Sequence, residues 1–149
     1  MKSNIRAFVV TALFAATSLV PAVHAQTGTV VKVNVPFAFD CGPSHFAPGT
    51  YTLNMIRMNT MLVRSPHNAG LVMTESDYSL KPNKTGIAVL RKYGDRYFLE
   101  ELWLPDSTTH IKVYESKWER RAATELASEG RNPSTIELAL LDVSQPTDR

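Results

Sequence analysis

The sequence predicts a mostly β protein, a single antiparallel β-sandwich or small barrel with one α-helix in its C-terminal half. Three observations support this fold class. Several short segments alternate apolar and polar residues with a period of two, turn residues separate these segments at short intervals, and only one segment has helical periodicity. Short strands joined by tight turns are typical of antiparallel all-β domains.

The first predicted strand covers residues 29–39. Its apolar side consists of Val31, Val33, Val35, Phe37 and Phe39. Pro36 has no N–H to donate to a neighbouring strand. We therefore expect an edge strand, or a strand in which the backbone at Pro36 faces away from a neighbour. Asp40 to Ser44 is a turn by composition.

Further strands are expected at residues 50–58, 61–65, 71–76, 85–93 and 96–104. The segment 77–84 is polar and contains a proline, so it is interpreted as a surface connection. Gly94-Asp95 suits a two-residue hairpin turn between the last two of these strands. That turn predicts that Leu90 faces Leu99, with Lys92 opposite Tyr97 and Arg91 opposite Phe98.

One helix is predicted at about residues 116–130. Ser116 and Glu119 have the spacing of a capping box, in which each side chain bonds the other residue's backbone N–H. Trp118, Ala122 and Leu126 recur at helical spacing, so we expect the helix to dock through Trp118. Gly130 suits the C-terminal cap. A last strand at 134–143 and a polar tail at about 144–149 complete the chain.

Residues 1–25 have the pattern of a cleavable signal peptide. Lys2 and Arg6 precede a mostly apolar run at 7–20, which Pro21 ends. Val23-His24-Ala25 then provides small or medium-sized residues at the positions that the peptidase recognises. The alternative, a retained membrane anchor, requires roughly 20 apolar residues, and this run is shorter. The expected product is an exported domain of residues 26–149, periplasmic or extracellular, with no transmembrane anchor after cleavage.

The charge and cysteine content restrict the classes of function. The chain has 16 Lys and Arg against 14 Asp and Glu. Cleavage would remove two basic residues and leave a formally neutral domain, which argues against nucleic acid as a partner. Cys41 is the single cysteine, so a packed core without an internal disulfide must stabilise the domain. We interpret Cys41 as a small residue near a turn and not as a nucleophile.

Four segments carry a resemblance to a known family. They are Val35-Pro36-Phe37-Ala38-Phe39, Pro48-Gly49-Thr50-Tyr51-Thr52-Leu53, Tyr93-Gly94-Asp95-Arg96-Tyr97-Phe98-Leu99 with Trp103, and Ser116 with Glu119. In their order they resemble a family of short exported β-rich proteins of unknown function that is common in acidobacteria. The chain departs from the usual pattern at Ala47-Pro48 and at Cys41. The resemblance implies an exported β-rich domain and no catalytic residue.

The candidates for a metal site are weak. His45, His67 and His110 lie in or beside predicted loops, and only the Cys41 and His45 pair approaches the close spacing of zinc ligands. Solvated histidines are ordinary in loops. The sequence therefore predicts no metal site and no cofactor.

The candidates for catalysis are Glu100 and Glu101, which interrupt an apolar strand. In a regular strand their side chains point to opposite faces, so one would lie among apolar neighbours, where its raised pKa would suit a general acid or base. The alternative is that one is solvated and the other pairs with Arg91 or Lys92. This second interpretation is favoured, so no catalytic residue is assigned.

Three functions remain open from the sequence. The favoured hypothesis is an exported non-catalytic domain that binds an envelope component or an apolar ligand, because the strands are rich in aromatic residues. A small envelope hydrolase using Glu100 or Glu101 is an alternative. A structural or interaction module that pairs through an edge strand around Pro36 is another.

Overall fold

The computed structural model describes residues 28–144. The predicted signal peptide and the tail beyond residue 144 lie outside the described residues. Strands make up 63% of the described part, and the mostly β fold with one helix in the C-terminal half is confirmed. Within this part, no helix has the length and apolar composition needed to cross a membrane.

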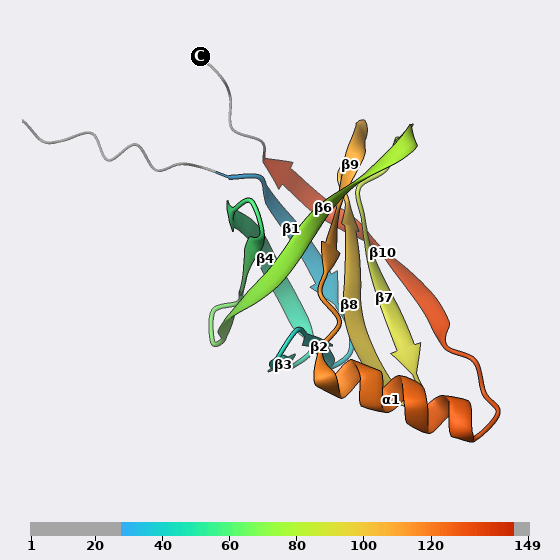
Figure 1. Ribbon diagram of the computed structural model, residues 1–149. Coiled ribbons are helices and arrows are strands. Elements are labelled where there is room, and N and C mark those ends of the chain that lie inside the picture. The colour runs from blue at the N-terminus through green and yellow to red at the C-terminus, as the bar shows by residue number, and fades with distance from the viewer. Residues whose placement is uncertain (1–27, 145–149) are drawn as a thin grey trace, which may run out of the picture.

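Eight antiparallel strands close into a barrel (Figure 1). They are β1 (Val30–Val35), β4 (Gly49–Arg57), β5 (Thr60–Arg64), β6 (Ala69–Asn83), β7 (Ile87–Tyr93), β8 (Arg96–Trp103), β9 (Ser107–Val113) and β10 (Ser134–Ser144). Their order around the barrel is β1-β4-β5-β6-β9-β8-β7-β10, and the pairing of β8 with β9 closes it. Of the two predicted architectures, the barrel is therefore the correct one.

Apolar side chains fill the barrel interior. Every second residue of β1, from Val31 to Val35, is buried, as the period-two pattern predicts. Phe39, Phe46 and Tyr51 form an aromatic cluster with ring centroids 5.1 to 5.3 Å apart. These side chains belong to one continuous apolar core, which includes the buried residues of β1, β4 and β5.

Two further elements lie together at one end of the barrel (Figure 1). The first is the hairpin of β2 (Phe39–Cys41) and β3 (Ser44–Phe46), a pair of short strands that the sequence analysis had assigned to a turn and its flanks. The second is α1 (Lys117–Ser128). Phe39, Cys41 and Phe46 are almost completely buried, so the hairpin extends the core.

The predicted edge position of the first strand is wrong. β1 pairs with β4 on one side and with β10 on the other, so it is an interior strand of the closed barrel. Pro36 follows the last residue of β1, which agrees with the alternative that its backbone faces away from a neighbour. Pairing with a partner through this strand would require one of its two existing neighbours to leave.

The predicted hairpin of β7 and β8 is confirmed, including its register. Leu90 faces Leu99, Arg91 faces Phe98 and Lys92 faces Tyr97. A bulge follows, because the register shifts between Val89 and Leu90. The bulge inserts an extra residue into β8 and rotates the side chains beyond it.

The helix begins and ends as predicted, but it docks through a different face. The Ser116 hydroxyl accepts a hydrogen bond from the Glu119 N–H at 3.1 Å. At the other end Gly130 adopts a φ of 69°, which glycine tolerates. The buried residues are Glu119, Ala122 and Leu126, whereas Trp118 is 42% exposed. The expectation that Trp118 docks the helix is therefore wrong.

The structure corrects one predicted strand boundary and adds one strand that the sequence analysis did not predict. β6 continues to Asn83, through the segment 77–84 that was expected to be a connection. β9 (Ser107–Val113) was not expected at all, although Thr109, Ile111 and Val113 alternate with polar residues. Its composition is mainly hydroxyl-bearing and charged, and its place between β6 and β8 depends on tertiary pairing.

Candidate functional site

An apolar groove lies on the outside of the molecule, between β6 and the start of α1. It has a volume of about 400 Å³. Its large apolar side chains are only partly covered: Leu71 is 58% exposed, Met73 53%, Tyr114 50% and Trp118 42%. We call this surface, together with Gly42 and Pro43, the apolar groove. Exposed apolar side chains gathered in one place are typical of binding surfaces.

The strand register creates one wall of the groove. Leu71, Val72 and Met73 are consecutive apolar residues of β6, so the strand presents apolar side chains to both faces. Val72 points into the core, while Leu71 and Met73 point outward. The opposite wall contains Tyr114 and Trp118. It is attached to β6 by a hydrogen bond in which the Tyr114 N–H donates to the Met73 carbonyl at 3.1 Å.

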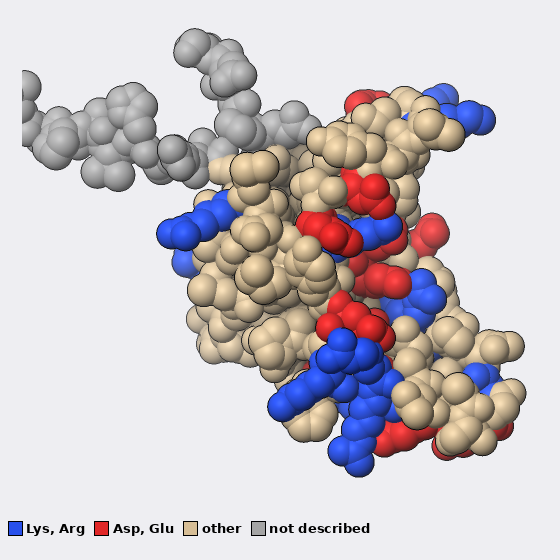
Figure 2. Space-filling model, viewed as in Figure 1, with Lys and Arg blue, Asp and Glu red and all other residues tan. Residues whose placement is uncertain are grey.

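Gly42 and Pro43, the turn between β2 and β3, also line the groove. Gly42 has a φ of 56°, and a Cβ there would lie 3.0 Å from Val72 Cγ1. Only glycine combines this backbone conformation with so close an approach. The turn can therefore lie directly against β6. Figure 2 shows the uncharged surface over β6 and the β2–β3 hairpin, with basic side chains along its edge where α1 starts.

A buried carboxyl group, that of Glu119, lies on the same turn of α1 as the groove residue Trp118. Glu119 is only 7% exposed, and it follows Trp118 on the first turn of α1. The pKa of Glu119 is raised to about 7, chiefly by burial and then by the nearby carboxylates of Glu100 and Glu115. The Ser116 N–H and Arg91 act in the opposite direction. The carboxyl with a raised pKa is thus Glu119, which the sequence analysis had assigned only to helix capping.

Glu100 and Glu101 do not point to opposite faces. Leu99 and Leu102 are both in the core, so the bulge turns both intervening carboxylates outward. Glu100 accepts two hydrogen bonds from Arg91, from Nε and from Nη2, each at 2.8 Å. The expected pairing with Arg91 across the hairpin is therefore present.

Glu101 belongs to a second polar group on the outer face of β8 and β9. Its Oε2 accepts a hydrogen bond from Trp103 Nε1 at 2.8 Å. The Trp103 ring stacks on His110, with centroids 3.9 Å apart. His110 is 5% exposed, its Nδ1 has no hydrogen-bond partner, and its Nε2 is 3.8 Å from Asp77 Oδ2. The ring is held mainly by stacking.

The candidate metal ligands are not brought together. His45 Nδ1 lies 2.7 Å from Asp40 Oδ1, Cys41 is buried in the core, and His110 packs against Trp103 on another face. Burial raises the pKa of the Cys41 thiol, with smaller contributions from Glu119 and Asp40. Among residues 28–144, no group of three or more His, Cys, Asp or Glu side chains is arranged to hold a metal ion.

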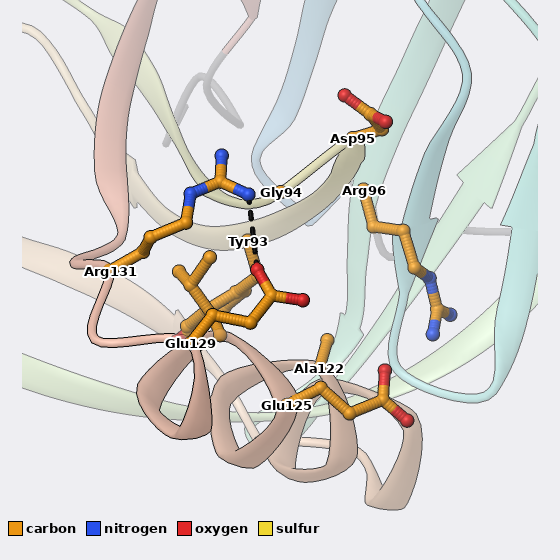
Figure 3. A pocket seen from close by; sticks show the side chains of 9 residues that line it. Tyr93, Gly94, Asp95, Arg96, Ala122, Glu125, Glu129 and Arg131 are labelled. Atoms are coloured by element: carbon orange, nitrogen blue, oxygen red, sulfur yellow. Dashed lines mark hydrogen bonds and ion pairs between the residues drawn. The ribbon is translucent and has the colours of Figure 1, made fainter.

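A charged cleft of about 240 Å³ lies between the β7–β8 turn and α1 (Figure 3). The carboxylates of Glu125 and Glu129 line it from the helix side. Each is already paired, since Arg131 Nη1 donates to Glu129 at 3.2 Å and Arg121 Nε donates to Glu125 at 2.9 Å. Arg96, which also lines the cleft, is paired with Asp40 at 2.8 Å, so most of the charges in the cleft are already paired within the protein.

No family model, curated protein or solved structure matches the chain. The fold and the site therefore define the class: a closed eight-stranded antiparallel barrel with an apolar core and an apolar groove on its outer surface.

Proposed function

We propose that the protein is an exported, non-catalytic binding domain that holds an apolar ligand in the apolar groove. The observation that carries the proposal is the gathering of Leu71, Met73, Tyr114 and Trp118 in one groove while each stays about half exposed. The groove volume of about 400 Å³ lies in the range of small-molecule binding sites. Covering these side chains would remove apolar surface from water, which favours binding.

Two observations support binding over catalysis. Glu100, a candidate catalytic residue, is engaged in two hydrogen bonds with Arg91. Glu101 accepts a hydrogen bond from Trp103 and lies opposite Lys112 in the β8–β9 register. Neither lines the apolar groove. The export part of the proposal is supported by the sequence pattern of residues 1–25, and mass spectrometry of the mature N-terminus tests it.

Titration with N-phenyl-1-naphthylamine, an uncharged apolar dye whose fluorescence rises in apolar surroundings, tests the groove. We expect saturable binding that weakens on the order of tenfold in Leu71→Ser and in Trp118→Ser, because each removes apolar contact area. Leu141→Ser is the matched control, since Leu141 is 60% exposed on β10 and outside the groove. Equal binding by all four proteins would refute the proposal.

A further inference from the structure

The far end of β6 carries exposed apolar side chains that the fold does not cover. Leu80 is fully exposed and Tyr78 is 74% exposed. The register explains their position: Tyr78 pairs with Thr109 and Asn83 pairs with Ser107. Four residues of β6 thus lie opposite a single residue of β9, and the intervening segment bulges outward.

The exposure of Tyr78 follows from the length of β6. Val72 and Thr74 lie on the inner face of β6 and are buried, whereas Ser76 and Tyr78 continue that face and are exposed. β5 begins at Thr60, which pairs with Met73, so β6 has no β5 residue beside it beyond that point. Figure 1 shows the end of β6 projecting at one end of the barrel, together with the start of β9.

Local hydrogen bonds hold the bulge in one conformation. The Ser79 hydroxyl donates to the Lys81 carbonyl at 2.8 Å and accepts from the Lys81 N–H at 3.2 Å. The Asp106 N–H donates to the Asn83 carbonyl at 2.7 Å and ties the bulge to the β8–β9 turn. Because the bulge is already ordered, little conformational entropy is lost when it meets a partner.

Two basic residues, Lys81 and Lys84, follow these apolar residues in the chain. Lys81 and Lys84 are exposed, and neither forms an ion pair with another described residue. Of the nearby carboxylates, Asp77 is bound by Lys112, and Asp106 lies in the facing turn. Figure 2 shows basic side chains at this projecting end. The local charge is positive.

We infer that this projecting end, which we call the β6 tip (Tyr78, Leu80, Lys81 and Lys84), docks on an anionic lipid surface. A convex projection suits a flat bilayer, unlike the concave apolar groove. Tyrosine and leucine enter the interfacial layer, and lysines meet the anionic headgroups. A second copy of the chain is a poorer fit, because two identical tips would bring like charges together.

Co-sedimentation with lipid vesicles tests the inference, using the protein purified after export. We expect binding to vesicles of phosphatidylcholine containing phosphatidylglycerol, little binding to pure phosphatidylcholine, and loss of binding at high salt. Leu80→Ser and the double variant Lys81→Gln/Lys84→Gln should each weaken binding on the order of tenfold. Met58→Ser is the control, because Met58 is 92% exposed at the β4–β5 turn and should leave binding unchanged.

Three results would overturn the inference. One is no binding to the anionic vesicles, and another is equal binding by Leu80→Ser and the unaltered protein. The third is a dimer, seen in sedimentation velocity, that Leu80→Ser dissociates, since this would assign the tip to a second copy. Trp118→Ser separates the two sites: if it abolishes vesicle binding and Leu80→Ser does not, the lipid surface is the apolar groove.

Discussion

The barrel interior and the contact between α1 and the barrel are both buried, yet they are stabilised in different ways. The interior is apolar, with Thr74 as a polar exception, and its energy comes from removing apolar surface from water. The contact under α1 includes a carboxyl group, Glu119, beside the paired Arg91 and Glu100. The stabilisation that comes from packing in the interior should therefore not depend on pH. The stabilisation that comes from the contact under α1 should change with pH.

The largest expected effect comes from the interior. Phe46 is fully buried and its ring centroid lies 5.2 Å from that of Phe39. Phe46→Ala should lower the free energy of unfolding by about 4 kcal/mol, because it removes buried apolar contact and leaves a cavity. Urea denaturation at pH 5 and pH 8 measures this loss. A loss that differs strongly between the two pH values would contradict the expectation that interior packing is independent of pH.

The second effect concerns Glu119. Its pKa in the folded protein is about 7 against an ordinary value of 4.5, so the folded state holds the proton more tightly. The contribution of Glu119 to stability should therefore be greatest below about pH 4.5, fall as the pH rises to 7, and stay lower above. Glu119→Gln imitates the protonated form and can still accept a capping hydrogen bond. At pH 8 it should be more stable than the unaltered protein by about 2 kcal/mol.

Urea denaturation across pH 4 to 8 compares the two proteins. The pH dependence attributed to Glu119 should disappear in the glutamine variant, and the two curves should meet at the acidic end. Glu125→Gln is the control, because that carboxylate is exposed on the same helix. If Glu119→Gln lowers stability at pH 8, the carboxylate is stabilising as a charge and the explanation by burial is wrong.

The third effect comes from Arg91, which bonds Glu100 and also lowers the pKa of Glu119. Its side chain is 35% exposed, so solvent weakens the pair. Arg91→Gln should lower the free energy of unfolding by about 1.5 kcal/mol at pH 8, since two carboxylates lose their cation. It should also move the midpoint of the Glu119-dependent fall in stability to higher pH. If the midpoint does not move, Arg91 does not influence the pKa of Glu119.

The smallest effect is that of the helix cap. Ser116→Ala removes the acceptor for the Glu119 N–H and should lower the free energy of unfolding by about 1 kcal/mol. Ser116→Asp restores an acceptor at the same position and should recover part of the loss. Circular dichroism during urea denaturation follows both variants. No difference between alanine and aspartate would show that the cap contributes little.

The alternation of apolar residues predicted most of the barrel strands, and the Gly94-Asp95 turn predicted the β7–β8 register. The same reasoning failed where pairing depends on distant segments. β9 is mainly polar and is placed by β6 and β8 on either side. The two faces of β8 were misassigned at Glu100 and Glu101, because a bulge changes the alternation without any glycine or proline to reveal it.

The candidate site could be predicted only in part. Leu71, Val72 and Met73 form an apolar run in the sequence, which indicates apolar residues on both faces of the strand. The run does not show that the outer two stay half exposed beside Tyr114 and Trp118. The capping box at Ser116 and Glu119 was visible, but burial of that glutamate was not, because burial depends on how the helix rotates against β7 and β8.

The sequence by itself determined the strand periodicity, the hairpin turn, both ends of the helix and the reliance on a packed core without an internal disulfide. The strand periodicity, the turn and the helix ends depend on the preferences of neighbours a few residues apart, and the absence of an internal disulfide follows from the single cysteine. The tertiary structure decided that the sheet closes, that β1 is an interior strand, and that α1 docks through Glu119, Ala122 and Leu126. The tertiary structure also decided that Trp118 and Leu80 remain exposed. Contacts between distant segments determine which apolar side chains are covered.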